Sequence, residues 1–294
     1  MTEKRKRRTS LEVEREKLEL ARTRMERIVV ERQLKRLYDA AKTTDQRPRR
    51  GTGASGNAVM QHAGSRLRDT ARYLDENDGN AIAVLDDLVD NIVGTGVTIE
   101  PQVASAGGEL AERTNRQIKE AWQAWWEGPE ITGTMPGQEV ERMVVRSWLR
   151  DGEVFIHHVD SQRAPHRTSL PYSLELLEAD YCPFDQVQGP STANDVVHGV
   201  EKDQWGRPLA YWIYLRHPGD TTVIGNSRAF EVKRVPAERM QHLAFRRRLH
   251  QTRGVSVLHG VINTLYDIKE AWESERVAMR VAAAMTGFVR KGLD

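Results

Sequence analysis

The sequence of 294 residues contains a single cysteine, which excludes two kinds of stabilising chemistry. One thiol forms no disulfide within the chain, and it cannot build a cysteine-rich metal site. We interpret Cys182 as a buried small apolar residue. Hydrophobic residues make up 39% of the chain, a share below that of a usual globular protein. Part of the chain is therefore expected to be solvated or to bury its surface only against partners.

Long hydrophobic runs are also absent. No apolar stretch approaches the roughly 20 residues of a membrane span. The N-terminus is charged and does not resemble a signal peptide. These absences predict a soluble chain that is made inside the cell and has no membrane partner.

The formal net charge of +2 hides an uneven distribution. Residues 1–50 carry 17 lysines and arginines against 9 aspartates and glutamates, whereas residues 51–294 carry 27 against 33. A basic extension of this kind is typical of a nucleic-acid-binding or partner-binding arm. A solubilising helix end is the alternative interpretation. The candidate DNA or partner contacts in this extension are Lys4, Arg5, Lys6, Arg7 and Arg8, which would neutralise phosphates without reading sequence.

The N-terminal region divides into a helical part and a linker. Leu11, Leu18 and Met25 recur every seven residues, and this spacing predicts an amphipathic helix. The next stretch is rich in Thr, Arg, Gly and Pro, a composition that disfavours helix. We therefore predict a basic amphipathic helical extension at residues 1–41, a linker at 42–56 and a body at 57–294.

The body alternates helical periodicity with short β patterns, which is typical of a mixed α+β fold. We expect Asn80 to cap the second helix and Ser256 to cap the last one. Trp122, Trp125 and Trp126 lie at helical spacing, so we interpret them as core anchors rather than as a base-stacking platform. The predicted helices are 58–73, 81–93, 109–126, 138–149 and 256–286, and the predicted strands are 97–101, 154–159, 173–177, 196–200, 209–215 and 234–245.

One pattern in the body suggests a metal site, formed by His157, His158 and Asp160. Neighbouring residues of a strand point to opposite faces, so both histidines could bind one ion only at a bulge or a turn. We therefore predict no metal site. A metal hydrolase that uses His157, His158 and Asp180 remains a third hypothesis, and it fails if the purified chain retains no metal.

Other catalytic patterns are weak. Glu175, Glu178 and Asp180 could form an acid-base set, but no second carboxylate cluster with the spacing of a nuclease or glycosidase accompanies them. The segment Gly94–Gly96 lacks the third glycine and the lysine of phosphate-binding loops. The sequence thus predicts neither a catalytic residue nor a cofactor, and we expect that the chain is not an enzyme.

A basic tract before the last predicted helix is the better functional candidate. It contains Arg246, Arg247, Arg248 and Arg253, which we take as further candidate DNA or partner contacts. Arginines at a helix N-terminus add to its positive dipole end and favour a phosphate or an acidic partner surface there. A salt-bridge patch between subunits, facing the acidic body, is the alternative.

Several short motifs follow one another in an order that resembles the lambda-type family of phage portal proteins. The strongest are a hairpin at Gly199–Trp212 and the loop Gln251–Ser256, which leads into the last predicted helix. The resemblance covers roughly residues 38–289. The other motifs are Tyr38–Ala41, Arg66–Arg68, Arg72, Asn77–Asn80, Asn91–Gly96, Leu177–Asp180, His217-Pro218, Arg234–Pro236 and His242-Leu243.

The resemblance implies an α+β fold with mixed helices and short antiparallel strands of the portal wing type, preceded by an N-terminal amphipathic helix. It further implies a structural subunit of a ring of about twelve copies at one capsid vertex. Such a ring forms the channel for DNA packaging and ejection. The partners implied are other copies of the chain, the terminase large subunit, a capsid or scaffold protein, head-tail connector proteins and double-stranded DNA. The implied location is the virion, with the host cytoplasm during assembly.

Two departures from the family pattern affect this interpretation. Family members are usually longer, so we expect that the body ends incomplete and that the part completing the stem and crown is missing. The basic helix at the N-terminus is not required by the pattern. A basic nucleic-acid-binding adaptor without ring function is therefore the alternative hypothesis.

Overall fold

The computed structural model describes residues 19, 22–25, 53–162, 164–168, 170–185, 194–220, 231–285 and 287. The chain divides into two compact units, Met1–Gly53 and Ala54–Asp294. In the first unit residues 19 and 22–25 are helical, and Thr23 Oγ1 donates a hydrogen bond to Glu19 O at 2.7 Å. The basic cluster at residues 4–8, and most of the predicted amphipathic helix and linker, lie outside the described residues.

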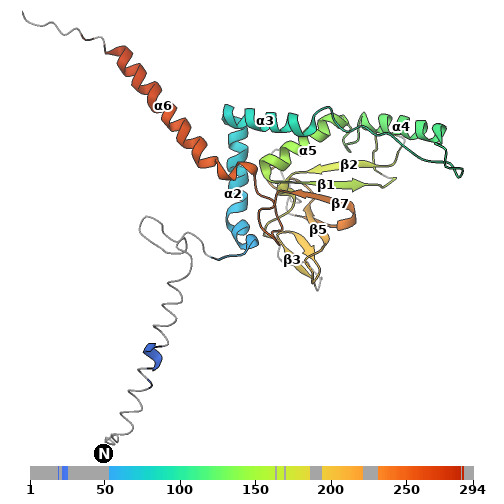
Figure 1. The fold of residues 1–294 in the computed structure, drawn as a ribbon, viewed down its shortest axis with the longest axis horizontal. Helices are drawn as coiled ribbons and strands as arrows, with labels where there is room; N and C mark the ends of the chain where they lie inside the picture. The colour runs from blue at the N-terminus through green and yellow to red at the C-terminus, as the bar shows by residue number, and fades with distance from the viewer. Residues whose placement is uncertain are drawn as a thin grey trace, which may run out of the picture. The chain divides into compact units, whose positions relative to one another are not determined.

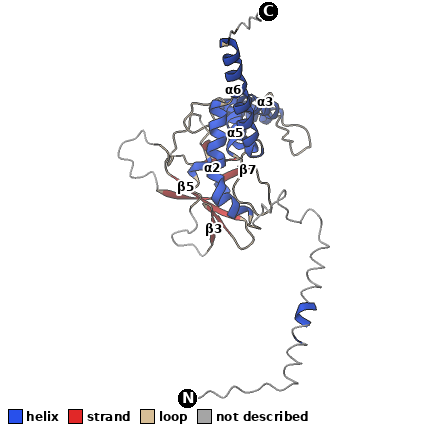
Figure 2. Ribbon diagram, turned by 90° about the vertical axis from the view of Figure 1, so that its left-hand side faces the viewer, coloured by secondary structure: helices blue, strands red, loops and turns tan. Residues whose placement is uncertain are grey.

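The second unit contains helices and two antiparallel sheets, so the predicted α+β class is confirmed. Figure 2 shows α2, α3 and α5 on one side of the strands. These helices form a common core through residues such as Leu74, Leu85 and Leu149, which are almost fully buried. The described α-helices of this unit are α2 (Gly56–Asn77), α3 (Gly79–Val93), α4 (Glu112–Trp126), α5 (Gly137–Asp151) and α6 (Ile262–Ala284).

The two sheets pack around a second core. In the first sheet β1 (Glu153–Val159) lies between β2 (Ser173–Leu177) and β7 (Met240–Ala244). Phe155 of β1 and Ile213 of β5 are fully buried in the cluster that both sheets share. The second sheet has the order β3 (Asp195–Val197), β4 (Val200–Lys202), β5 (Pro208–Tyr214) and β6 (Val232–Pro236). Short 3-10 turns are η2 (Ala179–Tyr181), η3 (Ala237–Arg239) and η4 (Val257–Gly260).

Two predicted helix caps differ from the structure. Asp78, not Asn80, caps α3, because its carboxylate accepts the backbone N–H groups of Asn80 and Ala81. Ser256 caps the short turn η4 by accepting from Leu258 N at 3.1 Å. The long helix α6 begins only at Ile262, so the basic tract does not adjoin its N-terminus.

Three predicted strands are also corrected. Residues 97–101 form no strand, because the Val97 amide donates to the Glu141 carboxylate instead of to a neighbouring strand. The predicted strand at 196–200 is two strands joined by a turn at His198 and Gly199, which both have positive φ. The predicted strand at 234–245 is β6 and β7, which belong to different sheets and are separated by η3.

The three tryptophans at the end of α4 form a mutual stack. Trp125 is buried, as predicted, and its indole N–H donates to Tyr172 O at 2.9 Å. Trp122 and Trp126 stack with ring centroids 5.0 Å apart, but both remain partly exposed. The core interpretation is therefore confirmed in full for Trp125 only.

The last helix differs from the others in its surroundings. Figures 1 and 2 show α6 extending away from the sheets. Along its 23 residues only Ile262, at its first position, is buried. This leaves α6 without a packing partner over most of its length among the described residues.

Candidate functional site

The basic tract at residues 246–253 forms the loop between β7 and η4, and hydrogen bonds fix its backbone. Asn57, near the start of α2, accepts Thr252 N at 2.8 Å and donates to His250 O at 3.2 Å. Gln251 accepts Arg247 N and donates to Arg253 O. His250 has a φ of 61°, an uncommon value for a residue other than glycine. The loop is thus held in one conformation against α2.

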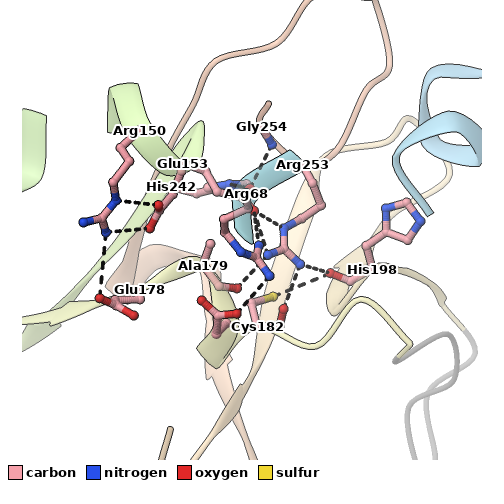
Figure 3. Close-up of polar contacts among 12 residues, drawn as sticks. Arg68, Arg150, Glu153, Glu178, Ala179, Cys182, His198, His242, Arg253 and Gly254 are labelled. Carbon is pink, nitrogen blue, oxygen red and sulfur yellow. Dashed lines mark hydrogen bonds and ion pairs between the residues drawn. The ribbon is translucent and has the colours of Figure 1, made fainter. Parts of the chain in front are cut away.

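Arg253 lies at the centre of the unit, with no exposed surface. Its Nε atom donates to Glu153 Oε1 at 2.8 Å, and Nη2 forms an ion pair with the same oxygen at 2.7 Å. The remaining donors reach three backbone carbonyls, those of Ala179, Cys182 and His198, at 2.8 to 3.0 Å (Figure 3). Each of the three guanidinium nitrogens therefore donates to an acceptor in its own chain. Arg253 joins η2, the turn after β3 and the start of β1.

Glu153 is the matching buried anion. Its Oε2 atom accepts Gly254 N at 2.9 Å and His242 Nε2 at 3.0 Å. Burial alone would raise the pKa of this carboxyl, but Arg253 and His242 hold the pKa well below its usual range. Glu153 consequently stays ionised and bridges β1, β7 and the loop.

Two glycines permit this close approach of backbone to backbone. A Cβ atom on Gly254 would lie 1.9 Å from Gly152 O, and one on Gly152 would lie 2.2 Å from the carbonyl carbon of Val255. Gly152 also has a φ of 85°, which favours glycine. Only glycine at both positions lets the loop pass near enough for Arg253 to meet Glu153.

A second ionic cluster borders the first one. Arg72 contacts Asp151 at 2.7 Å and Asp180 at 2.6 Å, and it lies 3.4 Å from Glu178. Arg68 pairs with Asp180 at 3.0 Å. Two carboxylates of the predicted acid-base set, Glu178 and Asp180, therefore serve as partners of arginines on α2.

The third carboxylate of that set, Glu175, lies elsewhere. It pairs with His157 Nδ1 at 2.7 Å, whereas His158 Nδ1 contacts the Tyr172 hydroxyl at 2.6 Å. In the part of the chain that the structure describes, one group has metal-ligand spacing. It consists of Glu178, Asp180 and His217, whose ligand atoms lie within 4.8 Å of one another. The structure does not bring His157, His158 and Asp180 together, and Arg72 already supplies a counter-charge to the group at Asp180.

The other arginines of the tract face solvent. Arg246, Arg247 and Arg248 are exposed, and Arg248 Nη1 donates to Ala54 O at 2.8 Å. Arg253 must be removed from the predicted set of DNA or partner contacts, because its side chain is enclosed by its own chain. The candidate contacts that remain in the described residues are thus the three consecutive arginines.

A family model described as "Phage portal protein, lambda family" matches residues 42–294. The chain belongs to this family of phage portal proteins. A probable portal protein of Halomonas phage phiHAP-1 is 27% identical over 248 residues, which are 83% of this chain and 47% of that relative. The chain therefore spans about half the length of that relative.

The portal family consists of structural proteins of the virion rather than of enzymes. The family resemblance in the sequence rested partly on the loop Gln251–Ser256, and the structure gives this motif a physical meaning. The loop is the segment that places Arg253 and Gly254 against Glu153. Among the helices of the described residues, none has the length and apolar character that crossing a membrane requires.

Two residues of this site were missed by sequence reasoning, Glu153 and Asn57. Glu153 carries a recognisable signal, because a charged residue stands directly before the apolar Val154 and Phe155 of a predicted strand. A carboxylate in such a run needs a buried cation. Asn57 carries no such signal, since it lies between the predicted linker, which ends at residue 56, and the helix predicted from residue 58.

Proposed function

We propose that the chain is a structural subunit of a ring-shaped portal at the unique capsid vertex. The ring forms the channel through which viral DNA is packaged and ejected, and it serves as the docking site for the terminase large subunit, for head-tail connector proteins and for capsid or scaffold protein. The ring contains about twelve copies, and no catalysis is assigned to it.

The observation that carries this proposal is the exposed apolar surface of α6. Ile268, Trp272 and Met279 share one face of the helix, and all three are exposed, Trp272 by 58%. A helix with this much exposed apolar surface is stabilised when a partner covers it, at about 1.5–3 kcal/mol for each large side chain that becomes fully buried. Neighbouring copies in a ring supply such a partner.

The buried ionic clusters support a structural role. Arg253 and Glu153 bind one another and the surrounding backbone groups, so this ion pair holds segments of the core together. The basic extension at residues 1–41, joined through a linker at 42–56 to the body from residue 57, is proposed as a contact with capsid, scaffold or DNA.

The molar mass of the purified chain, measured by light scattering across concentration, tests the proposal. We expect a closed assembly for the native chain and monomers for the double variant Trp272→Gln/Met279→Gln. Glu273→Gln, on the same helix, is the matched control and should assemble normally. A native chain that stays monomeric and binds duplex DNA with a steep salt dependence would instead support the adaptor hypothesis.

A further inference from the structure

A basic cavity lies between the tip of the β4–β5 hairpin and the loop at residues 246–253. Its volume is about 440 Å³, and its lining includes Lys202, Trp205, Arg246 and His250. Leu249, which precedes His250 in the loop, is 90% exposed. We call these five residues the cationic face.

Among the described residues, no carboxylate neutralises the lysine and the arginine of the cationic face. Lys202 Nζ donates to Thr252 Oγ1 at 2.7 Å. Within the described residues no carboxylate forms an ion pair with Lys202 or with Arg246. Burial and the nearby charge of Arg246 lower the pKa of Lys202. The two cations therefore repel one another, and an external anion would stabilise both.

The cationic face also exposes apolar surface. Trp205 is 84% exposed, and it and Leu249 are the two most exposed large apolar side chains in the described part of the chain. Tryptophan and arginine together are typical of the centres of protein interfaces. A DNA backbone would pair with the cations but would leave both apolar side chains in water. An acidic protein surface satisfies both components.

Both segments of the cationic face are held in place before any partner binds. Asp203 Oδ1 accepts the backbone N–H groups of Trp205 and Arg207 and so fixes the hairpin tip. Asn57 fixes the loop at His250. A preorganised surface loses less conformational entropy on binding.

We propose that the cationic face is one half of a head-to-tail interface between copies of this chain, with an acidic surface of the next copy as its occupant. This inference rests on the proposed ring. Apart from the four arginines at 246–253, residues 51–294 contain 23 lysines and arginines against 33 aspartates and glutamates, so the remainder of the body has the complementary sign.

Charge also selects the kind of interface. In an isologous contact centred on the cationic face, two copies of this face would meet and repel one another. In a heterologous contact the cationic face of one copy meets a different surface of the next, and repetition with a closing rotation produces a ring. The cationic face thus fits ring assembly and disfavours a twofold dimer centred on this face.

The double variant Lys202→Glu/Arg246→Glu tests the interface. We expect the concentration needed for assembly, measured by light scattering, to rise at least about tenfold. Arg113→Glu is the matched control, because Arg113 is exposed on α4 and has no ion pair among the described residues; it should assemble like the native chain. Unchanged far-ultraviolet circular dichroism spectra show that the variants remain folded. A double variant that assembles like the native chain overturns the inference and leaves the proposed ring standing.

A mixing experiment separates the two symmetries. The double variant keeps the acidic surface of the interface, so it can still bind the cationic face of a native subunit but cannot bind a further one. When one fifth of the subunits are variant, growing arcs should therefore end at the variant. The fraction of closed rings should then fall by more than one fifth. A loss of closed rings equal to the fraction of variant would mean that the variant is simply left out of the rings, and it would overturn the head-to-tail assignment. If the variant loses binding to duplex DNA but assembles like the native chain, the cationic face is a nucleic-acid contact instead. A native chain that never assembles overturns the ring and this interface together.

Discussion

Arg253 and Arg246 come from the same basic tract, yet they occupy opposite environments. Arg253 is enclosed and donates from all three of its guanidinium nitrogens, whereas Arg246 is exposed and forms no ion pair among the described residues. Composition treats the two arginines as equal. What separates them is Gly254, which brings the end of the tract against Gly152 and Glu153. The position of a glycine therefore decides which arginine is buried and links segments of the core, and which one stays exposed to a partner.

The comparison extends to energetics. A buried arginine and its carboxylate must be kept or lost together, because either one alone is a desolvated charge without compensation. An exposed arginine loses little when it is removed, because water replaces its contacts. Variants at Arg253 should consequently lower the stability of the fold strongly, whereas variants at Arg246 should change the stability little.

The largest effect is expected for Arg253→Met. This variant leaves Glu153 buried without its cation and leaves three backbone carbonyls, including those of Ala179 and Cys182, without a donor. The free energy of unfolding, measured with urea, should fall by about 3–5 kcal/mol. A fall in the free energy of unfolding of less than about 1 kcal/mol would contradict the structural role of Arg253 in the core.

The partner substitution supplies the control for this variant. Glu153→Gln in the Arg253→Met background removes the orphaned negative charge, so the double variant should be more stable than Arg253→Met alone. Additive losses from the two single variants would mean that the ion pair does not couple them.

Much of the fold could be predicted because short-range patterns set it. The strand at 173–177 matches β2, and the α5 helix follows its apolar periodicity from Gly137. The split of residues 234–245 into two strands could not be foreseen, because it depends on which sheet each half joins. For the same reason the environment of Arg253 was out of reach. Its partners Glu153, Ala179 and His198 come from segments far apart in the chain.

The pH dependence of stability gives a smaller, graded test near Arg253. Burial and then the charge of Arg253 lower the pKa of His198 to about 4, from an ordinary value of 6.5. Below pH 6.5 the unfolded chain binds a proton that the folded chain does not. Stability is therefore independent of this group above pH 6.5 and falls as the pH drops toward 4, by up to about 3 kcal/mol.

His198→Asn should reduce this slope. Asparagine tolerates the positive φ of 54° at this position, so the turn is preserved. Burial also lowers the pKa of His242, which leaves part of the slope in the variant. Urea midpoints at pH 7, 5.5 and 4.5 measure the effect, and identical slopes in the two proteins would refute the assignment to His198.

The smallest effect is expected for Arg246→Ala, and its sign is informative. Burial, and then repulsion by Arg246, lower the pKa of Lys202. Removal of Arg246 should therefore leave the free energy of unfolding unchanged or raise it by a few tenths of a kcal/mol. High salt screens the same repulsion and should erase any difference from the native chain. Urea unfolding at low and high ionic strength measures both the change in the free energy of unfolding and its dependence on salt. A loss of 1 kcal/mol or more would place Arg246 with Arg253 as a structural residue and would remove the contrast between core and surface within the tract.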